Sequence, residues 1–264
     1  MVYINKDKLS RFSLNKNNFY VVMDFDSTIT TSDSLGSWSV LENPNFVNPK
    51  LIEESHKLIE KYYPIELDYT LDEKAKSVYM QEWYTKNMEL FYTYGLTNDA
   101  LLNCIKNSNI KFRSGVDIFF NNLFNDNIPV IILSAGIGNV ITELLKLHNC
   151  FYDNIHIISN FIKFNNNSIL PFTDKIIHTS NKCINSLPVD FNNKINNKEY
   201  ILLFGDLIED LKMVSKEDLN RTLSFGFLEK NVSQNLELYK KDFDVVLTNN
   251  SSFYDIEDIL KTII

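Results

Sequence analysis

The chain has 264 residues, 44% of them hydrophobic and 23% charged, which predicts an ordinary globular protein of one large or two modest domains. The net charge of −8 argues against a nucleic-acid-binding surface, which normally needs a basic stripe. No apolar run approaches membrane-spanning length and the three cysteines form no close pair, so we expect a cytoplasmic protein with reduced thiols and no membrane partner.

The first predicted element is a buried strand over Phe19–Met23, because all five residues are apolar and two are valines. Asp24 and Asp26 follow it directly. If the chain stays extended, these two side chains project to the same side, while Phe25 points into the core. Two like charges this close need a compensating cation, so the pair indicates a metal or a charged substrate. An acidic turn after a strand is the alternative.

The stretch from about 35 to 112 shows no clear strand and predicts two amphipathic helices. Their apolar stripes are Leu51, Ile52, Leu58, Ile59 and Tyr62 in one helix and Ala75, Val78, Tyr79, Trp83 and Leu90 in the other. Thr70, with Glu73 three residues later, predicts the cap of the second helix. An insert here would lie over the carboxyl end of the first strand, where open α/β sheets bind ligands. We therefore expect a helical cap over 35–112 and a core of 1–34 and 113–264.

Beyond residue 113, strands alternate with helices. Two helices are expected, one starting at Ser114 with Asp117 as its capping partner and one from Asn139 to Leu147. Four apolar runs predict buried strands over Val130–Leu133, Ile155–Ile158, Tyr200–Phe204 and Val245–Leu247. This alternation predicts an α/β fold with a doubly wound, Rossmann-like and mainly parallel sheet.

Polar residues follow two of these strands. Ser134 to Gly138 is a small-residue turn before a helix, which suits an anion but also serves plain chain reversal. Asp206 and Asp210 supply oxygen ligands of the kind Mg²⁺ prefers, although an acidic first helical turn is the alternative. Lys182 lies between them and would otherwise be taken as a surface lysine.

Four features, in this order along the chain and at strand ends, resemble those of the haloacid dehalogenase superfamily of phosphotransferases. They are Asp24 with Asp26, the turn from Ser134 to Gly138, Lys182, and Asp206 with Asp210. The resemblance is closer to the cytosolic pyrimidine 5′-nucleotidase (5′-nucleotidase III) family and spans roughly residues 19 to 262. The linker from Thr30 to Phe46 looks nearer to bacterial than to animal relatives. The matching segments are Glu60 to Asp68, Glu82 to Lys86, Ser134 to Gly138, Ser159 to Phe161, Asn181-Lys182, Gly205-Asp206 and Asp210-Leu211.

The resemblance implies a reaction through an aspartyl-phosphate. Asp24 would be the nucleophile, and Asp26 would protonate the leaving 5′-oxygen and later activate water. Mg²⁺ would be held by Asp24, the backbone carbonyl of Asp26 and Asp206, with Asp210 ordering its shell. Glu209, within the loop from Asp206 to Asp210, stands where relatives usually carry a small residue and adds negative charge near the metal.

The resemblance also implies two groups of substrate-binding residues. Ser134, the Ala135 amide and Lys182 would hold the phosphate oxygens; Lys182 is preferred to Lys175 because the family places its lysine after asparagine. At the base end, the matching residues are Glu66 as acceptor, Asn87 as a polar contact, and Trp83 or Tyr84 as a stacking ring, with the helix core as the alternative for the aromatics.

The function implied is Mg²⁺-dependent hydrolysis of nucleoside 5′-monophosphates such as CMP or UMP. Two alternatives stay open: a phosphatase for another small metabolite such as phosphoserine, and a non-catalytic nucleotide-binding module. Asn139 replaces an acid common after the glycine turn, and this departure and Glu209 leave base preference open, including 7-methylguanosine monophosphate. The choice between a monomer and a weak homodimer also stays open.

Overall fold

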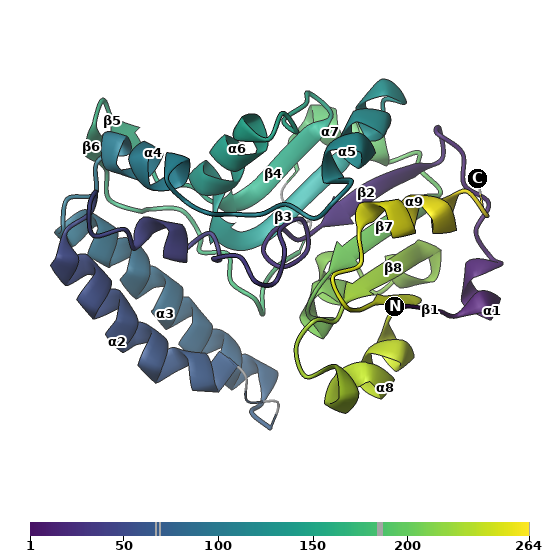
Figure 1. Ribbon diagram of the computed structural model, residues 1–264, viewed down its shortest axis with the longest axis horizontal. Helices are drawn as coiled ribbons and strands as arrows, with labels where there is room; N and C mark the ends of the chain where they lie inside the picture. The colour runs from purple at the N-terminus through teal and green to yellow at the C-terminus, as the bar shows by residue number, and fades with distance from the viewer. Residues whose placement is uncertain (67, 69, 184–186, 264) are drawn as a thin grey trace.

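The computed structural model describes the whole chain except residues 67, 69, 184–186 and 264. In this part of the chain, seven strands form one sheet in the order β1-β9-β8-β7-β2-β3-β4 (Figure 1). All neighbours pair in parallel except β1 with β9. The strands are β1 Val2–Ile4, β2 Phe19–Met23, β3 Val130–Ile137, β4 Ile155–Asn160, β7 Tyr200–Gly205, β8 Thr222–Phe227 and β9 Val245–Leu247. The predicted mainly parallel α/β fold is confirmed.

Helices and short elements complete the chain. A two-stranded ribbon joins β5 Phe164–Asn165 to β6 Ser168–Ile169. The 3-10 helices are η1 Ser39–Leu41, η2 Ile208–Met213 and η3 Asp218–Arg221. The α-helices are α1 Lys6–Leu9, α2 Pro49–Glu66, α3 Glu73–Thr93, α4 Asn98–Lys106, α5 Val116–Asn125, α6 Gly138–Leu147, α7 Val189–Ile195, α8 Val232–Asp242 and α9 Phe253–Leu260. None of the described helices combines the length and the apolarity needed to cross a bilayer.

The sheet is buried on both faces because its strands are apolar throughout. Val21 and Met23 pack with side chains of α5, α6 and α9, while Tyr20 and Val22 pack with side chains of α7 and α8. Successive strand residues therefore serve two separate hydrophobic clusters, as the two-residue period of a strand requires. The result is a layer of helices on each face of the sheet.

Strand β2 lies at the point where the strand order reverses. The chain runs outward from β2 through β3 to β4 on one side and through β7 and β8 to β9 on the other. Such a switch point opens a crevice at the carboxyl ends of the strands. The sequences that follow β2, β3 and β7 therefore converge.

The helices inside residues 35–112 separate into two groups. Helices α2 and α3 pack on each other to one side of the sheet, whereas α4 contacts α6 and η1 (Figure 1). The two linkers run side by side, because Thr30 and Phe112 form an isolated antiparallel bridge. The division into a core and a cap with these boundaries stays a prediction.

Two predicted helix starts are wrong. The carboxylate of Asp72, not Thr70, accepts the N–H groups of Lys74 and Ala75 at the start of α3, because a charged acceptor placed there is favoured by the helix dipole. The Thr70 hydroxyl instead donates to Asp68.

Helix α5 begins after Gly115, which has a φ of 84° and replaces the expected Ser114 cap. Strand β3 also runs further than predicted, through the small residues to Ile137 with a register shift. Strand β8 was not predicted: the sequence analysis identified no strand over Thr222–Phe227.

Candidate active site

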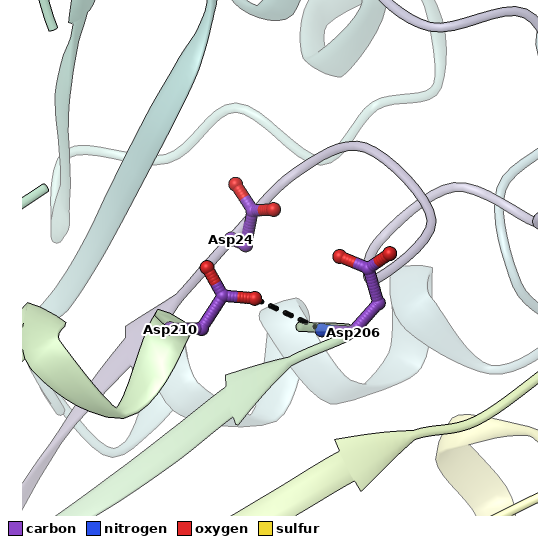
Figure 2. A group of neighbouring side chains, drawn as sticks. All are labelled: Asp24, Asp206 and Asp210. Atoms are coloured by element: carbon purple, nitrogen blue, oxygen red, sulfur yellow. Dashed lines mark hydrogen bonds between the residues drawn. The ribbon is translucent and has the colours of Figure 1, made fainter. Parts of the chain in front are cut away.

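Three carboxylates meet at the carboxyl ends of β2 and β7. Asp24 follows β2, Asp206 follows β7, and Asp210 lies in η2. Each offers an oxygen within 4.8 Å of the other two, and Figure 2 shows the three side chains gathered around one space. Asp24 and Asp210 are buried, at 5% and 1% exposure. An all-oxygen donor set of this kind fits a hard divalent cation such as Mg²⁺.

Asp210 is fixed by the backbone of the loop after β7. Its Oδ2 accepts the N–H groups of Asp206 at 3.1 Å and Leu207 at 3.0 Å, and the first bond is drawn in Figure 2. A Cβ on Gly205 would lie 2.5 Å from the same oxygen. Glycine is therefore required at the end of β7, because a side chain there would displace the Asp210 carboxylate.

Lys182 is the buried cation among these acids. Its Nζ lies 2.9 Å from Asp24 Oδ1 and 3.0 Å from Asp210 Oδ1, and the side chain is 4% exposed. Burial alone would lower the pKa of Lys182, but Asp210 and Asp24 raise it above its ordinary value. Lys175, the alternative weighed from the sequence, is exposed.

Burial disfavours charge on the carboxylates. It raises the pKa of Asp24 to about 7, against the opposing effect of Lys182. It also raises the pKa of Asp206 well above 3.8, and the charges of Asp210 and Asp24 add to the shift. Three carboxylates face one lysine, so ionising all of them leaves negative charge that the lysine does not compensate, and a bound cation would stabilise that ionised form.

Asp26 is held apart from this cluster by Ser37. The Ser37 N–H donates to Asp26 Oδ1 at 2.9 Å and its hydroxyl donates to Oδ2 at 2.7 Å. Burial raises the pKa of Asp26, and both bonds from Ser37 oppose the rise. Asp26 and Asp24 thus follow one strand but have different partners.

Residues at the end of β3 form a third side of the site. Ser134 is 1% exposed, and its hydroxyl accepts the Gly136 N–H at 3.1 Å. The Ala135 carbonyl accepts the indole N–H of Trp38 at 3.0 Å. Ser134, Ala135 and Gly136 all line the same cavity as Asp24 and Asp26.

That cavity has a volume of about 580 Å³ and extends from the carboxylates to helices α2 and α3. At the helical end, the Thr179 hydroxyl donates to Glu66 Oε1 at 3.3 Å. Burial raises the pKa of Glu66, while Thr179 and then Lys76 oppose the shift. Glu66 therefore presents a half-buried carboxylate within reach of a ligand.

The remaining polar groups at this end lie on α2, α3 and the linker before them. Ser55 bridges Asn87 Oδ1 and Glu42 Oε1, at 3.4 and 3.3 Å, and all three residues line the cavity. Trp83 and Tyr84 are also lining residues, with their rings edge to face at 5.6 Å. An aromatic wall beside carboxylates and an amide suits a flat, polar-edged ring.

The structure brings all the predicted residues to one cavity except Asp210, which lies directly behind it and contacts Lys182. The predicted lining residues are Asp24, Asp26, Glu66, Asn87, Ser134, Ala135, Lys182 and Asp206. The sequence analysis missed Ser37, Glu42, Ser55 and Thr179, because each meets its partner through loop or helix packing rather than through a strand end.

The chain resembles known nucleotidases along nearly its whole length. A family model described as pyrimidine 5′-nucleotidase (UMPH-1) matches residues 27–264. A 7-methylguanosine phosphate-specific 5′-nucleotidase of Homo sapiens is 32% identical over 255 residues, covering 92% of this chain and 84% of that protein. The B form from Xenopus laevis is 30% identical over 265 residues, covering 97% and 91%.

The fold of the chain also resembles the folds of solved phosphatase structures. Cytosolic 5′-nucleotidase IIIB bound to cytidine superposes with a TM-score of 0.86 at 25% identity, covering 99% of this chain and 93% of that one. A substrate-bound phosphoserine phosphatase superposes with a TM-score of 0.57 at 16% identity, covering 95% and 100%. The second likeness concerns the fold alone.

Proposed function

The chain belongs to the pyrimidine 5′-nucleotidase (UMPH-1) family, and from that premise we propose that it is a Mg²⁺-dependent phosphatase of nucleoside 5′-monophosphates such as CMP and UMP. As a member it is a 5′-nucleotidase, a hydrolase of the haloacid dehalogenase type. The observation that carries the proposal is a single cavity with carboxylates and a lysine at one end and Glu66 with aromatic rings at the other.

Mg²⁺ would be held by Asp24, Asp206 and the backbone carbonyl of Asp26, with Asp210 ordering its surroundings. The donor set supports this assignment, because three carboxylates with oxygens within 4.8 Å share only one buried lysine. When bound, the ion offsets the repulsion between the attacking carboxylate and the phosphate dianion. A cation there would also favour the ionised form of Asp24, whose pKa burial raises to about 7.

Asp24 is the proposed nucleophile. Its carboxylate oxygen attacks phosphorus, the bond from phosphorus to the 5′-oxygen breaks, and an aspartyl-phosphate forms. Lys182, with Ser134 and the Ala135 amide, holds the phosphate oxygens. The contact of Lys182 with Asp24 at 2.9 Å supports this role, because it places a cation beside the point of attack.

Asp26 is the proposed general acid and base. Its carboxyl proton passes to the leaving 5′-oxygen, and the carboxylate then takes a proton from the water that displaces Asp24. Burial raises the pKa of Asp26, which favours the protonated form needed in the first step. Its partners support the division of roles, since Asp26 contacts Ser37 while Asp24 contacts Lys182.

Glu66 is the proposed acceptor for the base, with Asn87 as a second polar contact and Trp83 or Tyr84 beside the ring. An exocyclic amino group, as in cytosine, would donate to the Glu66 oxygen that Thr179 does not occupy. Residues 35–112 would act as the cap over this end, consistent with α2 and α3 forming a separate pair.

7-Methylguanosine monophosphate is the second candidate substrate. The relatives that are 32% and 30% identical are named 7-methylguanosine phosphate-specific 5′-nucleotidases. N7-methylation gives the purine a positive charge, and the base end holds a second carboxylate, Glu42, in addition to Glu66. A cavity of about 580 Å³ also admits a purine.

Phosphate release from a panel of monophosphates tests the proposal. The panel contains CMP, UMP, AMP, GMP, 7-methylguanosine monophosphate, phosphoserine and a sugar phosphate, each with Mg²⁺ or EDTA. We expect nucleotides to give the highest kcat/KM and EDTA to abolish turnover. Faster hydrolysis of phosphoserine than of every nucleotide would reject the nucleotide assignment, and full activity in EDTA would reject the metal. Glu42→Gln should lower the preference for the methylated purine over CMP.

A further inference from the structure

Ser37 lies in the segment between β2 and α2 and has no exposed surface. It contacts both oxygens of the Asp26 carboxylate, with its N–H on one and its hydroxyl on the other, at 2.9 and 2.7 Å. Two bonds from one residue prevent the carboxyl group from rotating about Cβ–Cγ unless one of them breaks. Asp26 therefore has a defined orientation before any ligand binds.

Ser37 is itself fixed against the end of β3. The Ile137 N–H donates to its Oγ at 3.3 Å, and a Cβ on Gly136 would lie 2.0 Å from that oxygen. The neighbouring Trp38 donates to the Ala135 carbonyl at 3.0 Å. Ser37 therefore sets the orientation of Asp26 relative to β3, the strand that carries Ser134.

We propose that Ser37 is a positioning residue that aims the carboxyl group of Asp26 at the leaving oxygen. This inference rests on the proposed function, in which Asp26 is the general acid. The Asp26 proton moves to the ester oxygen while the bond from that oxygen to phosphorus breaks and the Asp24–phosphorus bond forms. A carboxylate has about four lone-pair directions, and Ser37 occupies one on each oxygen, so the transferred proton takes one of the two that remain.

The role predicts a dependence on the leaving group. A nucleoside leaves as an alkoxide, which is a strong base and needs the proton, whereas p-nitrophenolate is a weak base and leaves without it. Loss of the aim of Asp26 should therefore slow formation of the aspartyl-phosphate from a nucleotide and spare its formation from p-nitrophenyl phosphate, whereas the later attack of water is the same for both substrates. Damage to the end of β3, where phosphate would bind, should slow both substrates equally.

The experiment compares kcat/KM, which reports the steps up to formation of the aspartyl-phosphate, for CMP and p-nitrophenyl phosphate in wild type, Ser37→Ala, Asp26→Ala and the double variant. We expect Ser37→Ala to lose about 10- to 100-fold on CMP and less than about 3-fold on p-nitrophenyl phosphate. In the Asp26→Ala background, Ser37→Ala should add no further loss on CMP. Ser108→Ala is the matched control, because its hydroxyl bonds the Ile105 carbonyl outside the cavity.

Equal losses on both substrates, or a further large loss in the Asp26→Ala background, would overturn the inference and leave Ser37 as a support of β3. If Ser37→Ala does not fold, Ser37→Cys, with a weaker donor, allows the same comparison of the loss on CMP with the loss on p-nitrophenyl phosphate. A wild-type protein that cleaves p-nitrophenyl phosphate and phosphoserine but no nucleotide would reject the proposed substrate instead. The Ser37 comparison would then be made with phosphoserine, which also leaves as an alkoxide.

Discussion

The two ends of the cavity are built differently. At the acidic end, Lys182 reaches Asp24 and Asp210 at 2.9 and 3.0 Å, and all three are at most 5% exposed. At the helical end, the contacts of Glu66 with Thr179 and of Ser55 with Asn87 measure 3.3 and 3.4 Å. The first end is a network of short charged contacts, and the second a set of longer and weaker ones.

The difference follows from the elements that carry the residues. The acidic end is fixed by neighbouring parallel strands, whose register leaves little freedom to the residues that follow them. The helical end depends on how α2 and α3 lie over the sheet. We therefore expect the proposed bond-breaking groups to be preorganised, and changes in the proposed base-binding groups to have modest effects on the rest of the site.

The largest effect is expected from Asp24→Asn at the acidic end. Removing the proposed nucleophile should lower kcat on CMP by about 1,000-fold or more. The metal-free protein should stay folded, because Lys182 retains Asp210 and one buried charge is gone. Phosphate release gives the rate and a thermal melt gives the control; turnover within tenfold of wild type would contradict the role.

Gly205→Ala probes the same end without replacing a carboxylate. The added Cβ would displace Asp210, so we expect the Mg²⁺ concentration for half-maximal rate to rise about 10- to 100-fold. Excess Mg²⁺ should restore part of the rate in this variant but not in Asp24→Asn. An unchanged Mg²⁺ dependence would mean that Asp210 does not order the metal site.

Glu66→Ala is the corresponding change at the helical end. Loss of the acceptor should lower kcat/KM for CMP by about tenfold and leave p-nitrophenyl phosphate, which has no base, unchanged. Glu66→Gln serves as the matched control because it retains an acceptor oxygen. Parallel losses on both substrates would show that Glu66 supports the fold and does not read the base.

The smallest expected effect is on stability. Burial raises the pKa of Asp24 from 3.8 to about 7, so its contribution to the free energy of unfolding is present below 3.8 and is lost as the pH rises through 7. Mg²⁺ requires the ionised form, so its stabilising effect should grow over the same range. We expect Mg²⁺ to raise Tm by about 2–4 °C more near pH 8 than near pH 5.5.

Thermal melts in Mg²⁺ and in EDTA at both pH values measure this difference directly. Subtracting the EDTA curve from the Mg²⁺ curve removes the effect of groups outside the proposed ligand set, such as His178, whose pKa burial lowers to about 4. An Mg²⁺ effect that shrinks as the pH rises would contradict the assignment of the cation to buried carboxylates.

Much of the core was predictable from local patterns. Phe19–Met23 and Val245–Leu247 are strands with the predicted bounds, because short apolar runs rich in valine suit a parallel sheet that is buried on both faces. The acids after Phe19–Met23 and Tyr200–Phe204 also converge as expected, since parallel strands bring their carboxyl ends to one edge. Strand β8 was missed although it is fully buried, because Ser224 and Gly226 interrupt its apolar pattern.

Five strands of the described sheet, the acids that follow two of them and the family were evident from the sequence, because apolar runs and matched segments can be recognised along the chain. The tertiary structure was needed to find the partners of those acids. Ser37 meets Asp26 through a loop, and Thr179 meets Glu66 across 113 positions of the chain. Hydrogen bonds of this kind depend on how loops and helices pack in three dimensions, which no local periodicity records.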